Sequence, residues 1–158
     1  MAIHYIDSIS KQDATGRIQQ VYQELKDEMG EVVEPISLHA ILPNLLEYVW
    51  GILRETVLVE DQLNRSQKEA IAAAVSVSNN CTYCVDAHTI MLIGLEDKVI
   101  ANAISRNNPQ EIPDEFTRSL VVWSLNTKAF SSREIANPPF EPYVLPFTSP
   151  GNHQGKET

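Results

Sequence analysis

Residues 66–94, SQKEAIAAAVSVSNNCTYCVDAHTIMLIG, decide the fold of this chain. Ser66 and Glu69 have the spacing of a capping box, in which a hydroxyl and a carboxyl group three residues apart satisfy free N–H groups at a helix start. The alanine-rich run 70–77 follows directly. Alanine is the strongest helix former, and its small side chain lets neighbouring elements pack closely. The stretch therefore opens with a predicted helix.

The asparagine pair Asn79-Asn80 interrupts this predicted helix. A second helix is expected to begin near Cys81 and to run to about Ile93, with Gly94 as its stop, because glycine often ends a helix in a left-handed conformation. If the chain turns at the asparagine pair, the two helices fold back on each other. An antiparallel helical hairpin is therefore the expected centre of the molecule.

Helical periodicity continues on both sides of the hairpin. Apolar residues recur every three or four positions in residues 13–29, ahead of Gly30, and in a segment that Pro43 opens and Leu53 closes. A further helix is expected from Pro113-Asp114-Glu115, with an apolar face listed as Phe116, Leu120, Trp123 and Thr127. No internal repeat and no strand pattern appears. The predicted fold class is all-α, a helical bundle.

The chain is expected to form one domain followed by a tail. A length of 158 residues suits a single domain. Ser131–Glu134 offers a second, weaker cap signal, but five prolines lie between Pro138 and Pro150 in a stretch with little periodicity. We therefore expect a helical domain over residues 1–136, and over residues 137–158 an extended or disordered tail, or an arm that folds on a partner.

Composition and charge argue against several classes of protein. The net charge of −9, with no cluster of Lys or Arg, disfavours binding to nucleic acid, because the phosphate backbone repels a negative surface. No apolar run reaches the ~18 residues that a membrane span needs. Residues 1–7 have neither the basic nor the apolar region of a signal peptide. The expected location is cytoplasmic.

The chemistry of the chain is concentrated in the segment 81–88, CTYCVDAH. On a helix, Cys84 lies roughly 60° around from Cys81, and His88 roughly 40° from Cys84, so the three side chains share one face. If the helix begins at Asn80 or Cys81, both thiols lie in its first turn, where the helix dipole favours a thiolate. Such a pair can close a disulfide, and the imidazole can take or return a proton.

Glu69 enters this site only if the hairpin forms. It lies 12 residues before Cys81, which is roughly 18 Å along an unbroken helix. With a turn at Asn79-Asn80, Glu69 is brought level with His88, and Cys84 lies about one turn nearer the loop. A carboxylate can then orient or deprotonate the imidazole, which in turn serves the thiol.

Other interpretations of these residues stay open from spacing alone. Glu69 could serve only the capping box, His88 could be an ordinary helix histidine, and the cysteines could be buried hydrophobes. Zinc could use the same four donors, although structural zinc sites usually combine two ligand pairs from separate turns. Covalent haem is excluded because Val85, and not histidine, follows Cys84. A thioredoxin-like fold would need a strand before the motif.

The pattern Glu69, Asn80-Cys81-Thr82-Tyr83-Cys84, His88 resembles the alkylhydroperoxidase D-like proteins of the carboxymuconolactone decarboxylase superfamily. The resemblance covers about Asn64 to Leu95 and is looser back through Trp50 and Pro43. It implies an all-α fold around a helical hairpin and a homo-oligomer, a trimer or hexamer.

The resemblance also implies an activity, the reduction of peroxides by a dithiol. Cys84 matches the cysteine that attacks the peroxide, Cys81 matches its more exposed resolving partner, and His88 and Glu69 match the proton relay. Where the best-known members have a further histidine between the two cysteines, this chain has Thr82-Tyr83. Related decarboxylases lack the CxxC pair, so its presence argues against lactone decarboxylation.

The expected function is therefore a CxxC-dependent peroxidase. Its partners are a hydroperoxide substrate and an external dithiol or reductase, and the chemistry requires no organic cofactor and no metal. Two alternatives remain: a dithiol redox sensor or adaptor without catalysis, and a lactone or hydroxy-acid enzyme that uses Glu69 and His88.

Overall fold

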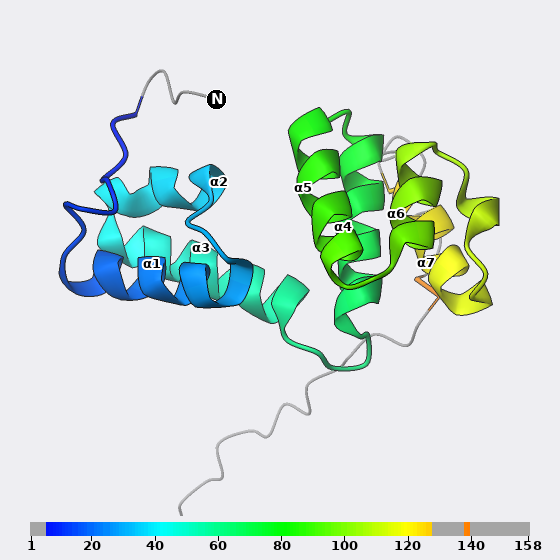
Figure 1. The fold of residues 1–158 in the computed structure, drawn as a ribbon, viewed down its shortest axis with the longest axis horizontal. Coiled ribbons are helices and arrows are strands. Elements are labelled where there is room, and N and C mark those ends of the chain that lie inside the picture. Colours follow the sequence, from blue (N-terminus) through cyan, green and yellow to red (C-terminus); the bar gives the residue numbers. More distant parts are fainter. Residues whose placement is uncertain (1–5, 128–137, 140–158) are drawn as a thin grey trace, which may run out of the picture.

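The chain folds into helices joined by short turns (Figure 1). The computed structural model describes residues 6–127 and 138–139, and this part of the chain contains no strand. The α-helices are α1 (Gly16–Met29), α2 (Glu34–Ser37), α3 (Pro43–Leu53), α4 (Arg65–Ser78), α5 (Thr82–Gly94), α6 (Lys98–Ser105) and α7 (Glu115–Leu125). Shorter 3-10 or π-helical turns are Leu38–Ile41, Arg54–Leu58 and Pro109–Glu111. The predicted all-α fold class is confirmed.

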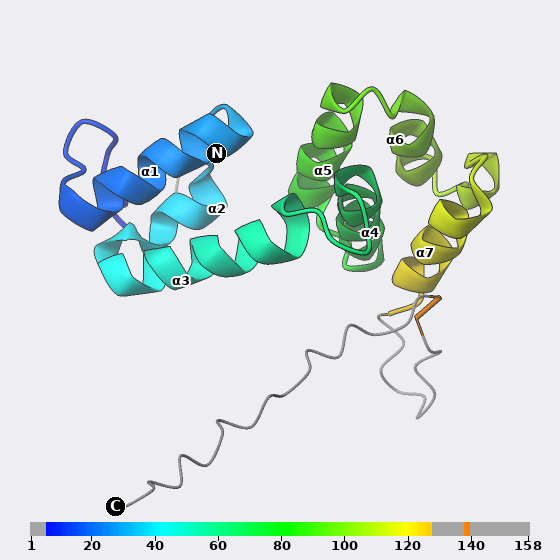
Figure 2. The ribbon, with the colours of Figure 1, turned by 90° about the horizontal axis from the view of Figure 1, so that it is seen from below.

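The helices form two groups, each with its own core. Figures 1 and 2 show α1, α2 and α3 packed together on one side and α4 to α7 on the other. The first core is built around Leu25, Leu46 and Trp50. The second core is rich in alanine from α4 and includes Leu92 of α5. The turn Arg54–Leu58 leads from α3 toward α4 and joins the two groups.

Two predictions lie wholly or almost wholly outside the described residues. The cap signal at Ser131–Glu134 falls in residues 128–137, which the structure does not describe. The same holds for the predicted tail at 137–158, apart from residues 138–139. A single domain over residues 1–136 stays a prediction.

The predicted end of α1 and the predicted start of α3 are confirmed. Gly30 ends α1 with φ of 83°, and its N–H donates to the carbonyl of Lys26. This left-handed conformation suits glycine, which has no Cβ to clash with the backbone. Pro43 is the first residue of α3, where a missing N–H costs nothing.

The start of α4 differs from the prediction, and the difference matters for the site. The capping box is made by Asn64 and Gln67, not by Ser66 and Glu69. The Asn64 side chain accepts a hydrogen bond from the N–H of Gln67 at 2.9 Å, and the Gln67 side chain accepts from the N–H of Asn64 at 3.1 Å. Asn64 has the extended backbone that an N-cap needs. Glu69 is consequently free of any capping role.

The asparagine pair turns the chain as expected. Asn79 caps α4, and Asn80 follows with φ of 56°, a left-handed value that asparagine tolerates better than most residues. The N–H groups of Asn80 and Cys81 donate to the carbonyls of Val77 and Ser76, each at 3.0 Å. These bonds form a Schellman motif that ends one helix and redirects the chain into the next. Helices α4 and α5 form the predicted hairpin (Figure 1).

The predicted end of α5 is correct to within one residue, but the glycine does not take the left-handed conformation expected of it. Gly94 is the last helical residue, and Glu96 takes the left-handed conformation with φ of 67°. The N–H groups of Glu96 and Asp97 donate to the carbonyls of Ile93 and Leu92. The chain therefore ends this helix with the same motif as α4, although the left-handed position carries a glutamate.

Helix α6 was not predicted, and the predicted face of α7 is partly wrong. At eight residues, α6 is shorter than the window of about 11–18 residues over which a helical period is judged. In α7, Phe116 is 38% exposed and Thr127 lies beyond the helix end. The face that packs inward includes Leu120 and also Ser124, whose hydroxyl donates to the Leu120 carbonyl at 2.8 Å. A hydroxyl satisfied by its own helix can be buried, which a hydropathy pattern does not reveal.

Within the described residues, none of the helices combines the length and the apolar character that crossing a membrane would require.

Candidate active site

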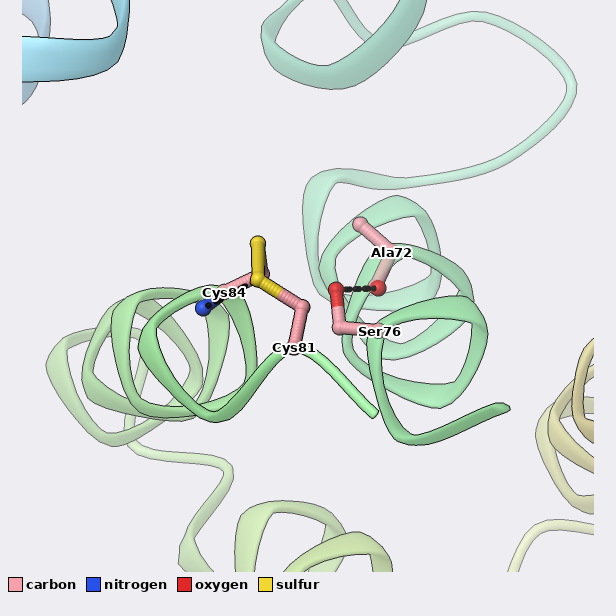
Figure 3. Close-up of a disulfide and its surroundings, with 4 residues drawn as sticks. All are labelled: Ala72, Ser76, Cys81 and Cys84. Atoms are coloured by element: carbon pink, nitrogen blue, oxygen red, sulfur yellow. Dashed lines mark hydrogen bonds between the residues drawn. A yellow bond between two sulfur atoms is a disulfide. The ribbon is translucent and has the colours of Figure 1, made fainter. Parts of the chain in front are cut away.

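A disulfide between Cys81 and Cys84 lies at the start of α5 (Figure 3). Cys81 is the N-cap of this helix, and its sulfur accepts a hydrogen bond from the N–H of Cys84 at 3.3 Å. Figure 3 shows the neighbouring turn of α4, at Ala72 and Ser76, beside the disulfide. The predicted placement of both sulfur atoms in the first turn is correct. The structure represents the oxidised state of the dithiol.

Glu69 and His88 meet across the helical hairpin. Oε2 of Glu69 accepts a hydrogen bond from Nδ1 of His88 at 2.6 Å. The Glu69 side chain is 1% exposed and the His88 side chain 24% exposed. Because Nδ1 carries the hydrogen that the carboxylate accepts, the neutral ring is the Nδ1–H tautomer. Nε2 is then the ring nitrogen that can take a proton. The contact has the register expected from the spacing of the two residues along the hairpin.

Arg65 is a third member of this cluster, and sequence reasoning missed it. Its Nε and Nη2 atoms donate to Oε1 of Glu69 at 2.9 and 2.6 Å. Both oxygens of the buried carboxylate are thereby engaged, one by the guanidinium and one by the imidazole. Arg65 precedes Glu69 by four residues, a spacing that places two side chains on one helix face. This spacing in the sequence could have indicated that Arg65 contacts Glu69.

A mainly apolar cavity of about 180 Å³ lies at Cys84 and His88. Tyr83, Ala87 and Met91 of α5 also line it. The opposite wall comes from the N-terminal group of helices and consists entirely of apolar side chains, namely Met29, Val33, Pro35, Ile36, Leu53, Val57 and Leu58. The cavity could therefore accept a small molecule with an apolar part next to the Cys84 sulfur.

The two cysteines border different hollows. Cys84 lines the apolar cavity together with Glu69 and His88, whereas Cys81 lines a second hollow of about 290 Å³. The walls of this second hollow include polar residues such as Asn80, Thr82 and Asp86. The disulfide thus lies between an almost wholly apolar cavity and a hollow whose lining mixes polar and apolar residues.

A metal site is not apparent in the part of the chain that the structure describes. Across residues 6–127 and 138–139, no three His, Cys, Asp or Glu side chains are grouped closely enough to bind one metal ion. The zinc alternative left open by the sequence has no such cluster to support it. The four donors that it invoked are engaged otherwise: the sulfur atoms bond to each other and Glu69 contacts Arg65 and His88.

Comparison with known protein families agrees with the motif. The model of the Carboxymuconolactone decarboxylase family matches residues 43–97. This range contains Glu69, both cysteines and His88. Residues 43–97 belong to the carboxymuconolactone decarboxylase family. The resemblance inferred from the spacing of these residues is thereby confirmed, and the family match begins at the first residue of α3.

Among curated proteins, the chain is similar to one from Mycobacterium tuberculosis that is named an alkyl hydroperoxide reductase. The two are 36% identical over 125 residues, which is 79% of this chain and 36% of the relative. The chain therefore spans little more than a third of that relative's length. Comparison with solved structures gave no significant match.

Proposed function

We propose that this carboxymuconolactone decarboxylase family chain is a CxxC-dependent peroxidase. The Cys84 thiolate reduces the hydroperoxide, and the two cysteines are oxidised together to the Cys81–Cys84 disulfide. The observation that carries the proposal is the joint lining of one cavity by Cys84, His88 and Glu69, with His88 bonded to Glu69. The name of the mycobacterial relative supports the same reaction.

The first step uses the reduced dithiol. Nε2 of His88 takes the Cys84 proton, and the thiolate attacks the terminal oxygen of the hydroperoxide. The O–O bond breaks, Cys84 becomes a sulfenic acid, and the alcohol leaves with the proton from His88. Glu69 stabilises the imidazolium that forms between these two proton transfers, because its carboxylate accepts the Nδ1 hydrogen.

The second step closes the disulfide. The Cys81 thiolate attacks the Cys84 sulfur, the S–O bond breaks, and the hydroxyl leaves as water after taking a proton. Cys81 is suited to be the attacking thiolate because an N-cap sulfur lies beside free backbone N–H groups of the helix. An external dithiol or reductase then reduces the disulfide by thiol–disulfide exchange.

The assignment of roles to the two cysteines is supported by the two hollows. The peroxide needs a site beside the general base, and Cys84 lines the described cavity that His88 also lines. Cys81 borders the second hollow, which has a mixed lining and from which a reductant can approach without entering the apolar cavity.

The decisive experiment compares two variants in a peroxide-consumption assay with dithiothreitol as reductant. Cys84→Ser should abolish turnover. Cys81→Ser should consume about one equivalent of peroxide, form a sulfenic acid that dimedone traps, and then stop recycling. Full activity in Cys84→Ser contradicts the proposal.

The same assay separates the alternatives. Peroxide consumption at background level in the unsubstituted protein points to a dithiol sensor or adaptor. Activity on a lactone or hydroxy acid that survives alkylation of both thiols points to an enzyme based on Glu69 and His88.

Two further elements belong to this proposal. A cytoplasmic location suits it, because that compartment keeps dithiol reductants available. A homo-oligomer, a trimer or hexamer, suits the apolar residues that α3 and its approach expose, namely Ile41, Leu42, Leu45, Tyr48 and Ile52. Light scattering of the purified chain measures its oligomeric state directly.

A further inference from the structure

We propose that Arg65 is a positioning residue of the Glu69–His88 relay and that its charge tempers the electrostatic field at the imidazole. The guanidinium holds the Glu69 carboxylate in place and offsets part of its negative potential at the imidazole. The proposal concerns the site of the peroxidase reaction proposed above and rests on that function for its catalytic meaning.

The contacts form one continuous chain from guanidinium to imidazole. Arg65 donates through two nitrogens to Oε1 of Glu69, and His88 donates to Oε2 of the same carboxylate. The two guanidinium N–H groups converge on one carboxylate oxygen, and these charge-assisted hydrogen bonds are stronger than bonds between neutral groups. With Glu69 1% exposed and Arg65 18% exposed, this arrangement is shielded from solvent.

The other charged groups near the relay leave Arg65 as its main compensating charge. On the loop before α4, a Glu60 oxygen accepts from the backbone N–H of Arg65 at 3.0 Å. Lys68 is buried but pairs with Asp61 at 2.9 Å. Among the described residues, the other titratable side chains of α5 that line the cavity of His88 are Tyr83 and Cys84, and the disulfide keeps Cys84 from titrating. The lining that comes from the N-terminal helices is apolar.

A simpler role for Arg65 is that of an ordinary ion pair between helix positions four apart, which adds only slightly to stability. The geometry goes beyond that role. An exposed pair of this kind is screened by water, whereas Glu69 is buried. Its second oxygen, Oε2, also accepts a hydrogen bond from His88. Removing Arg65 leaves a more negative potential at the imidazole, which favours the protonated ring.

The test follows the His88 ring by NMR as the pH is changed, with the disulfide intact so that neither thiol titrates. The chain has four histidines, and loss of a signal in His88→Gln assigns the resonance. In Arg65→Gln, we expect the midpoint of the His88 titration to rise by about one pH unit. In Arg65→Lys, which retains the positive charge, most of this shift should disappear.

A matched control removes an arginine elsewhere. Arg106 lies 4.0 Å from Glu111 at the end of α6 and is 70% exposed. Arg106→Gln makes the same change of net charge and should leave the His88 midpoint within about 0.2 pH units of the unsubstituted protein. The proposal is overturned if Arg65→Gln also leaves the midpoint there, or if Arg106→Gln moves it equally.

A double-mutant cycle shows whether Arg65 acts through Glu69. In a Glu69→Gln background, Arg65→Gln should move the His88 midpoint by less than half as far as it does with Glu69 present, because only the direct Coulomb effect of the guanidinium then remains. An equal shift in both backgrounds overturns the positioning role. If Arg65→Gln alone does not fold, a shift of about one pH unit between Glu69→Gln and the double variant has the same meaning, since the double variant removes both members of the buried pair together.

Activity supplies a separate readout. If the chain is a peroxidase, the acid limb of its pH–rate profile should move to higher pH in Arg65→Gln, in step with the NMR midpoint. If the unsubstituted protein consumes no peroxide, the proposed function fails, while the NMR titration still decides the positioning role of Arg65.

Discussion

Oε2 of Glu69 lies 2.6 Å from Nδ1 of His88, and this contact joins α4 to α5 across a separation of 19 residues. It depends on the turn at Asn80, since a continuous helix would carry the two groups far apart. The carboxylate is buried, so its charge acts on the imidazole with little screening by solvent. This relationship is the structural basis of the expected chemistry.

Glu69→Gln is expected to lower the peroxidase turnover number by about 10²-fold, which is typical for loss of an acid–base contribution. The amide oxygen can still accept from Nδ1 of His88, but it carries no charge to stabilise the imidazolium. Stopped-flow measurement of peroxide consumption, at saturating dithiol, checks the rate. A matched change at the exposed Glu96, Glu96→Gln, should have no effect. A loss of less than about threefold in Glu69→Gln would argue against the relay.

Filling the apolar cavity is expected to raise the KM for a bulky peroxide much more than the KM for a small one. Val57 lines the cavity from the turn after α3, on the side opposite Cys84. In Val57→Trp, the KM for cumene hydroperoxide should rise by about tenfold, which corresponds to about 1.4 kcal/mol of lost binding. The KM for hydrogen peroxide should change by less than about twofold, because this substrate needs space only at the sulfur.

The control for this experiment is Val99→Trp, on a valine of α6 that is 54% exposed and does not line the cavity. Equal effects of Val57→Trp on both peroxides would show that the wall made by the N-terminal helices does not select the substrate.

Asp114 is expected to contribute to the loss of stability in acid. The N–H and the side chain of Thr117 donate to this N-cap carboxylate, and these hydrogen bonds lower the pKa of Asp114 below its ordinary value. Because the folded-state pKa is the lower one, the stabilisation is complete above the unfolded value of about 3.9 and is lost as the pH falls through the folded value.

The measurement compares urea unfolding of the unsubstituted protein and of Asp114→Asn at pH 7 and pH 3. Asparagine also caps a helix but does not titrate, so the stability difference between the two proteins should shrink in acid. An unchanged difference across this range would contradict the role of the Asp114 charge.

Glu96→Gly is expected to stabilise the fold by about 1 kcal/mol, because residue 96 has φ of 67° and glycine adopts this conformation without a steric penalty. For a chain of this size the melting temperature should rise by about 2–4 °C. Thermal unfolding followed by circular dichroism checks this. Glu96→Ala, which keeps a Cβ, should give no such gain, and equal gains in both variants would point to the lost charge instead of the backbone.

The sequence by itself determined the features that depend on local spacing. The break at Asn79-Asn80, the helix after Cys81 and the register of Glu69 with His88 follow from fixed helical geometry and from residues that favour a turn. The family was also readable from the same residues. The catalytic roles of Cys84, Cys81, His88 and Glu69 stay predictions that the variants above test.

Only the tertiary structure decided which groups share a buried environment. The sequence allows a capping box that starts at Ser66 or one that starts at Asn64. The structure has the one at Asn64, whose backbone is extended. Glu69 therefore contacts Arg65 and His88 instead of capping the helix. The apolar wall facing Cys84 comes from residues more than twenty positions away, between Met29 and Leu58. Burial is set by elements that meet in space, and periodicity within one helix cannot specify which distant side chains will cover it.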